Sequence, residues 1–126
     1  MKIDYIDDVN EYGDHMVRLY DLNMKEAILF REALYQTVIV DKKNLDLSTI
    51  DFIESRNCTL ELRISDEDNG IVADDNQHFV CELTYESYQK MIFLLEPFCK
   101  KETKGYQFLY DVDSPTDFLF SPAGTW

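Results

Sequence analysis

The sequence predicts an α+β fold because two segments have helical periodicity and several short segments alternate between apolar and polar residues. Apolar residues recur at helical spacing in 27–38 and 88–99, and they alternate with polar residues in 58–65 and 78–83. The 126 residues, of which 45% are hydrophobic, suffice for one hydrophobic core. We therefore expect a single domain over 15–126, preceded by a flexible acidic lead-in over 1–14 to which no regular structure is assigned.

The first strand and the first helix are predicted to follow one another directly. Residues 15–21 alternate as a half-buried strand does. Asn23 and Glu26 then have the spacing of a capping box, in which each side chain satisfies a free backbone N–H of the other residue. The helix is expected to end at Thr37 or Val38, and its core-facing stripe is Ala27, Phe30, Leu34 and Val38.

The middle of the chain is predicted to form a hairpin. Residues 41–56 give no clear element, although a connection of this length without structure is unusual in a compact domain. Residues 58–65 give the clearest strand signal, and 78–83 read as the returning strand. Between them, 66–77 form a turn region in which Asn69-Gly70 suits the positive φ angles of a tight hairpin.

The second helix is predicted to begin after Thr84, whose side chain can cap it. Its core-facing stripe is Tyr88, Met91, Ile92, Leu95 and Cys99. Pro97 is expected to end or kink this helix, and 106–111 read as a last strand. The resulting β-α-β-β-α-β order indicates a ferredoxin-like sandwich, in which two helices cover one face of a mostly antiparallel four-stranded sheet.

Acidic residues are concentrated in three stretches of the chain. The protein has 25 acidic and 12 basic residues, which gives a formal net charge of −13. Residues 64–89 hold seven acidic residues and no basic one, and 1–14 and 105–126 are also acidic, whereas the rest of the chain is nearly balanced. Such a charge favours solubility, repels nucleic acid and anionic membranes, and attracts cationic partners. We therefore predict no nucleic-acid partner and no membrane partner.

The sequence contains no motif that commits it to a reaction or a cofactor. Two histidines and three cysteines without a C-x-x-C pair argue against a metal site. The run from Asp66 lacks the spacing of an EF-hand loop, because Gly70 is its fifth residue and not its sixth. His78 and Cys81 would point to opposite faces of their strand and so cannot meet. We therefore predict no cofactor and lean towards a non-enzymatic protein, while carboxylates that converge from distant positions keep an enzyme open.

The N-terminus and the hydropathy of the chain indicate a cytoplasmic protein. The acidic N-terminus lacks the basic and apolar regions of a secretory signal. The longest apolar run, 91–95, is far shorter than the ~20 residues that span a bilayer.

The C-terminal tail, 112–126, combines prolines with large apolar residues. We expect it to pack back on its own domain, because exposed aromatic side chains would be costly. The alternative is that the tail anchors a partner or a second copy of the chain through its aromatic side chains, Phe118, Phe120 and Trp126.

The simplest interpretation of these features is a charged, soluble surface with no specific partner, and three functional hypotheses stand beside it. The first is a binding module for a cationic protein surface, which uses five acidic residues, Asp66, Glu67, Asp68, Asp74 and Asp75. The second is a small-molecule-binding or enzymatic domain with a pocket between the sheet and the tail. The third is a homodimer joined through the sheet or the tail.

Overall fold

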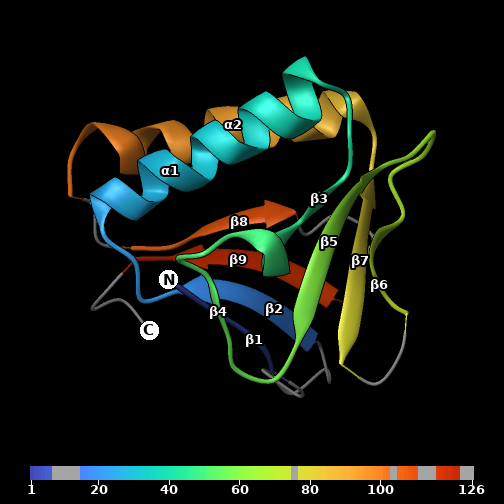
Figure 1. The fold of residues 1–126 in the computed structure, drawn as a ribbon, viewed down its shortest axis with the longest axis horizontal. Helices are drawn as coiled ribbons and strands as arrows, with labels where there is room; N and C mark the ends of the chain where they lie inside the picture. The colour runs from blue at the N-terminus through green and yellow to red at the C-terminus, as the bar shows by residue number, and fades with distance from the viewer. Residues whose placement is uncertain (7–14, 75–76, 103–104, 111–115, 123–126) are drawn as a thin grey trace.

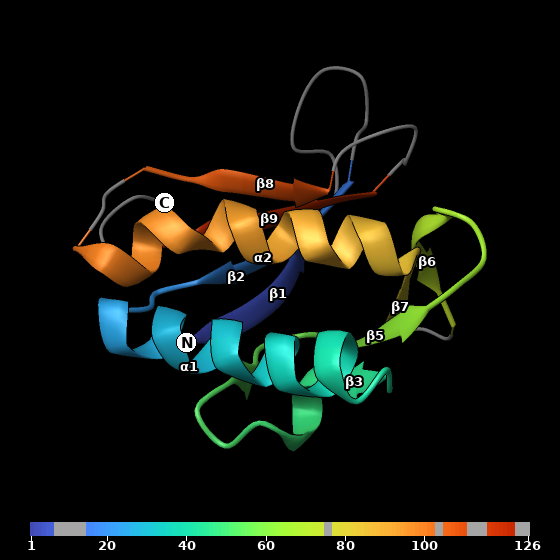
Figure 2. The ribbon, with the colours of Figure 1, turned by 90° about the horizontal axis from the view of Figure 1, so that it is seen from above.

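Two mixed β-sheets lie beneath two α-helices that run side by side (Figures 1 and 2). The computed structural model describes residues 1–6, 15–74, 77–102, 105–110 and 116–122. The helices are α1 (Met24–Leu34), which continues as the π-helical turn η1 (Tyr35–Val40), and α2 (Tyr85–Lys100). The strands are β1 (Lys2–Ile6), β2 (His15–Tyr20), β3 (Leu45–Asp46), β4 (Glu54–Ser55), β5 (Thr59–Ile64), β6 (Gly70–Ala73), β7 (His78–Leu83), β8 (Gln107–Tyr110) and β9 (Thr116–Ser121).

The strand order confirms the α+β class and corrects the predicted topology. Within the described residues, five strands pair in the order β4-β1-β2-β9-β8 and four in the order β3-β5-β7-β6. The predicted ferredoxin-like sandwich, with its single antiparallel sheet of four strands, is therefore wrong. Parallel pairs lie inside both sheets, β2 with β9 and β5 with β7, and each joins strands that are not consecutive in the sequence.

The acidic lead-in, for which the sequence predicts no regular structure, contains strand β1. Strand β1 pairs antiparallel with β2, so that Asp4 lies opposite Arg18. Ile3 is buried in the core, and the Asp4 carboxylate accepts two hydrogen bonds from the Arg18 guanidinium, at 2.8 and 3.1 Å. A buried apolar side chain and a paired charge on alternate faces explain why so acidic a segment is ordered. Residues 7–14 of the predicted lead-in lie outside the described residues.

Helix α1 begins where the capping box predicts. The Asn23 side chain accepts from the Glu26 backbone N–H at 2.9 Å, and the Glu26 carboxylate accepts from the Asn23 backbone N–H at 3.3 Å. Beyond Leu34 the helix widens into η1, in which the Asp41 N–H reaches the Gln36 carbonyl. The predicted stripe of Ala27, Phe30, Leu34 and Val38 is fully buried.

The segment 41–56, which gave no clear element, contains three short ones. Strand β3 pairs with β5, a 3₁₀ turn spans Leu47–Thr49, and β4 pairs with β1 in parallel. Asp46 caps the 3₁₀ turn by accepting from the Ser48 backbone N–H at 2.9 Å. Each element is too short to produce a period in the sequence.

The predicted hairpin between 58–65 and 78–83 is wrong in its topology. Both strands exist, as β5 and β7, but they are parallel neighbours. The segment between them contributes β6, which pairs antiparallel with β7 on the side away from β5. Asn69-Gly70 therefore does not form a hairpin tip. Gly70 begins β6, and its φ of 77° explains why glycine suits this position.

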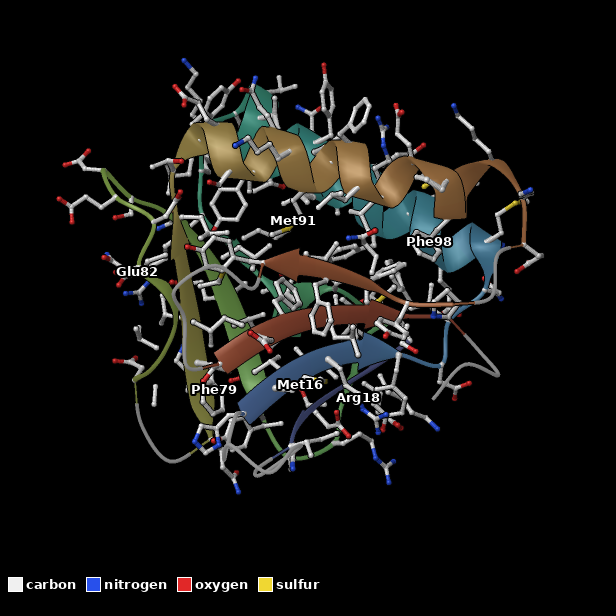
Figure 3. The ribbon with its side chains drawn as sticks, turned by 180° about the vertical axis from the view of Figure 1, so that it is seen from behind. Met16, Arg18, Phe79, Glu82, Met91 and Phe98 are labelled. Atoms are coloured by element: carbon white, nitrogen blue, oxygen red, sulfur yellow. The ribbon has the colours of Figure 1, made fainter. Side chains whose placement is uncertain are left out.

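Helix α2 is capped by Thr84 as predicted, and it continues through Pro97 to Lys100. Pro97 lies in the last turn, so the backbone hydrogen bond that proline lacks is lost only close to the helix end. Met91 and Phe98 point from α2 towards the sheets (Figure 3), and both are buried.

The C-terminal segment contributes an interior strand. Strand β9 lies between β2 and β8, parallel to β2 and antiparallel to β8. Phe118 and Phe120 are fully buried. The Phe120 ring packs on Phe98 of α2 at 5.1 Å and on Phe30 of α1 at 6.1 Å between ring centroids, so β9 joins both helices to the sheet.

Candidate functional site

The first candidate site is the loop between β5 and β6, where Asp66, Glu67 and Asp68 follow one another. Asp66 and Glu67 are exposed, and neither has an ion-pair partner among the residues that the structure describes. Backbone hydrogen bonds hold both ends of the loop, from the Ser65 N–H to the Leu83 carbonyl at 2.9 Å and from the Asn69 N–H to the Glu82 carbonyl at 2.8 Å. The loop is therefore anchored to β7 while its first two carboxylates face solvent.

Asp68 fastens the same loop to the start of α2. Its carboxylate accepts from the Thr84 backbone N–H at 2.8 Å and from the Ser87 hydroxyl at 2.9 and 2.8 Å. Desolvation alone would raise the pKa of Asp68, but these hydrogen bonds hold that pKa below its usual value. Asp68 is thus ionised at neutral pH, and its hydrogen bonds serve the fold.

Asp74 lies at the opposite end of β6 from this loop. It is exposed, and one of its carboxylate oxygens is 4.0 Å from Nε2 of His78. The acidic run 66–75 is therefore divided by a strand into two places, and the structure brings together Asp66, Glu67 and Asp68 but not Asp74. Asp75 lies outside the described residues.

The structure places two of the three predicted aromatic site residues of the tail inside the protein. Phe118 and Phe120 have no exposed surface, since they belong to β9 and to the core cluster. They present no surface to a partner, and their burial counts against a pocket lined by them between sheet and tail. Trp126 lies outside the described residues.

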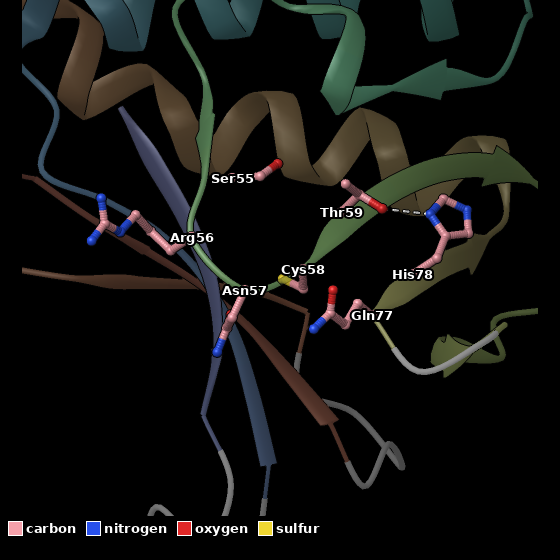
Figure 4. A pocket seen from close by; sticks show the side chains of 7 residues that line it. All are labelled: Ser55, Arg56, Asn57, Cys58, Thr59, Gln77 and His78. Atoms are coloured by element: carbon pink, nitrogen blue, oxygen red, sulfur yellow. Dashed lines mark hydrogen bonds between the residues drawn. The ribbon is translucent and has the colours of Figure 1, made fainter.

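A second candidate site is a polar cleft of about 310 Å³ at the beginnings of β5 and β7 (Figure 4). Its seven lining residues come from the β4–β5 segment and the start of β7, and they are Ser55, Arg56, Asn57, Cys58, Thr59, Gln77 and His78. Within it, the Thr59 hydroxyl lies 2.6 Å from Nδ1 of His78. Such a hydroxyl–imidazole pair is the contact by which a base activates a nucleophile.

The neighbours of this pair favour a structural role for it. Thr59 and His78 are register partners on adjacent parallel strands, so the sheet itself places them together. Burial, and secondarily the charge of Asp4, raises the pKa of Cys58 to about 12, which keeps this thiol neutral and weakly nucleophilic. Asn57 is engaged with the Tyr5 backbone, accepting from its N–H at 2.8 Å and donating to its carbonyl at 3.0 Å.

Sequence reasoning missed two features of the protein surface. The Thr59–His78 contact depends on the parallel pairing of β5 with β7, which no local sequence pattern indicates. The second feature is Phe93, which is exposed on α2. Helical spacing places it off the buried stripe of that helix, so its exposure could have been predicted from the sequence.

The described part of the chain contains no cluster of three His, Cys, Asp or Glu side chains placed to hold a metal ion. None of the helices in that part is long and apolar enough to cross a bilayer. Comparisons with protein-family models, with curated proteins and with solved structures found no match for this chain.

Proposed function

We propose that this protein is a binding module whose β5–β6 loop engages a cationic protein surface. The observation that carries the proposal is the way Asp68 anchors the loop. Its hydrogen bonds to Thr84 and Ser87 fix the backbone beside Asp66 and Glu67, whose carboxylates stay exposed. A partner would then meet two carboxylates whose backbone is already ordered, which reduces the entropy cost of association.

The electrostatic setting supports the same proposal. Of the chain's 25 acidic residues, seven lie in 64–89 without a basic residue among them. Asp66 and Glu67 have no ion-pair partner among the described residues, whereas other carboxylates are matched within the fold, as Asp4 is by Arg18 and Glu96 by Arg31. Unmatched carboxylates on a protein of net charge −13 steer cationic partners and raise their association rate.

The test compares two double variants that remove the same amount of charge. Asp66→Asn with Glu67→Gln neutralises the loop, and Glu32→Gln with Asp51→Asn neutralises two other exposed acidic residues. The tagged full chain is used to recover partners at low salt and at ~0.5 M salt, where the screening length falls to a few ångströms. We expect wild type and the Glu32/Asp51 variant to recover the same basic protein, at low salt only. The loop variant should recover at least about tenfold less of that protein, because it has lost a favourable charge contact. Equal recovery by the two double variants would contradict the assignment to the loop.

A further inference from the structure

A stripe of exposed side chains runs along the outward face of α2. Its members follow one another at intervals of four, three, four and three residues, which keeps them on one side of a helix, and they are Glu86, Lys90, Phe93, Pro97 and Lys100. Phe93 stands at the centre and is 73% exposed, the highest value among the large hydrophobic side chains described. Seen from above, α1 lies beside α2 and the sheets lie beneath both helices (Figure 2). An aromatic side chain therefore stands on the face of α2 turned away from the core.

Two charged residues of opposite sign stand on this stripe at equal distances from Phe93. Glu86 precedes Phe93 by seven residues and Lys100 follows it by seven, so each lies about 10 Å away along the helix axis. Neither of these charged side chains has an ion-pair partner within the described ranges. Lys90 and Glu96, three residues to either side of Phe93, have the reverse order of sign and lie on opposite flanks of α2, Lys90 beside Asp68 and Glu96 beside Arg31.

We propose that this face binds a second copy of the chain, with the two α2 helices antiparallel and Phe93 on the twofold axis. A twofold rotation that reverses the helix direction places Glu86 of each copy opposite Lys100 of the other. It also packs Phe93 on its counterpart. A parallel arrangement would instead set Glu86 against Glu86, so charge selects the antiparallel one.

The surface beside Phe93 is hollowed. A hollow of about 440 Å³ adjoins the ring and is lined by Phe93, Glu96, Pro97, Lys100 and Lys101. The Phe93 ring of the second copy enters this hollow next to Pro97. Glu96 is held by Arg31 at 3.1 Å, which fixes one wall. Each copy carries a net charge of −13, and one helix face buries little area, so the dimer belongs to the weak class of interfaces below about 1,200 Å².

Sedimentation equilibrium of the full chain tests the proposal. Over concentrations from about 10 μM to about 1 mM, which suit weak interfaces, the mass should rise from 14.9 kDa towards twice that value. Phe93→Glu should lower the association constant at least about tenfold, since it removes the central aromatic anchor. The matched control is Tyr106→Glu, which changes another exposed aromatic residue, 55% exposed and outside α2, and should associate as wild type does. Thermal unfolding followed by circular dichroism shows that each variant is folded.

Charge reversal tests the antiparallel arrangement separately. Glu86→Lys and Lys100→Glu should each weaken association at least about threefold, because like charges then meet twice across the axis. The double variant restores opposite charges and should associate within about twofold of wild type. A chain that stays monomeric at every concentration, a Phe93→Glu variant that associates like wild type, or a double variant no better than the single ones would each overturn the proposal.

Discussion

The hydroxyl of Tyr88 on α2 lies 2.7 Å from the carbonyl oxygen of Cys81 on β7. The same hydroxyl lies 2.8 Å from the carbonyl oxygen of Arg63 on β5, so one side chain reaches two neighbouring parallel strands. Tyr88 is fully buried, and burial raises the pKa of its phenol far above the ordinary value. The phenol therefore stays protonated and ties α2 to the four-stranded sheet.

Removal of this hydroxyl should destabilise the protein measurably. Tyr88→Phe keeps the ring and removes the buried hydroxyl that lies between the Cys81 and Arg63 carbonyls, which costs about 0.5–1.5 kcal/mol of unfolding free energy. Urea denaturation of both proteins measures the difference. Tyr35→Phe, at a tyrosine that is 47% exposed, is the control and should change stability by less than about 0.5 kcal/mol. A Tyr88→Phe variant as stable as wild type would show that the contact contributes nothing.

Asp68 should contribute to the stability of the fold, whereas the nearby Asp66 should not. Asp68→Ala removes an acceptor for the Thr84 N–H and the Ser87 hydroxyl and should cost about 0.5–2 kcal/mol, as the loss of a helix cap does. Because folding lowers the pKa of Asp68 from 3.8, its contribution is present above pH 4 and is lost as the pH falls below that value. Urea denaturation at pH 7 and pH 3 checks both statements. Asp66→Ala, which removes the same charge, should be neutral within about 0.5 kcal/mol at both pH values.

The half-buried ion pair between Asp4 and Arg18 should be stronger than an exposed pair elsewhere. The two side chains are 14% and 16% exposed, whereas Glu54 and Arg56 are 59% and 54% exposed. Asp4→Asn should therefore cost about 1–3 kcal/mol, and Glu54→Gln at most about 0.5 kcal/mol, because solvent screens the second pair. Chemical denaturation measures the free energy of unfolding of both variants. Equal losses of stability would contradict the argument that burial strengthens the Asp4–Arg18 pair.

The buried thiols should make the protein less stable in alkali. Burial raises the pKa of Cys58 and of Cys81 from 9.0 to about 12. Their contribution is complete below pH 9 and declines between pH 9 and pH 12, because only the unfolded chain releases these protons there. The free energy of unfolding is measured by denaturation under reducing conditions from pH 7 to pH 10.5. It should fall less steeply with pH for Cys58→Ala than for wild type, by up to about 1.4 kcal/mol per pH unit. If the free energy of unfolding fell equally steeply with pH in both proteins, the raised pKa of Cys58 would be contradicted.

Local patterns predicted several elements correctly, and long-range pairing is what they could not reveal. Asn23 and Glu26 specify a helix start through their own side chains, and the alternation in 58–65 specifies a half-buried strand. The pairing of His15 with Thr116 joins distant parts of the chain, and nothing near either residue identifies the other. The β-α-β-β-α-β order was wrong for this reason, since it assumed that strands close in sequence are neighbours in space.

The candidate site shows the same division between local and distant information. The excess of negative charge in 64–89 is visible in the sequence, and Asp66 and Glu67 are exposed in the structure. The use of Asp68 as an anchor and the separation of Asp74 by β6 depend on tertiary contacts. The sequence predicts that the tail packs on its own domain and leaves a surface anchor as the alternative, and only the position of β9 between β2 and β8 decides this for Phe118 and Phe120.

The most direct test of the proposed function is the salt dependence of partner binding by the loop. The dissociation constant for the basic partner is measured between about 0.05 and 0.5 M salt, a range over which the screening length falls severalfold. We predict a steep loss of affinity with salt for wild type, and both weaker binding and a shallower slope for the Asp66→Asn, Glu67→Gln variant. A wild-type affinity that does not change with salt, or a variant that follows the wild-type curve, would contradict the account.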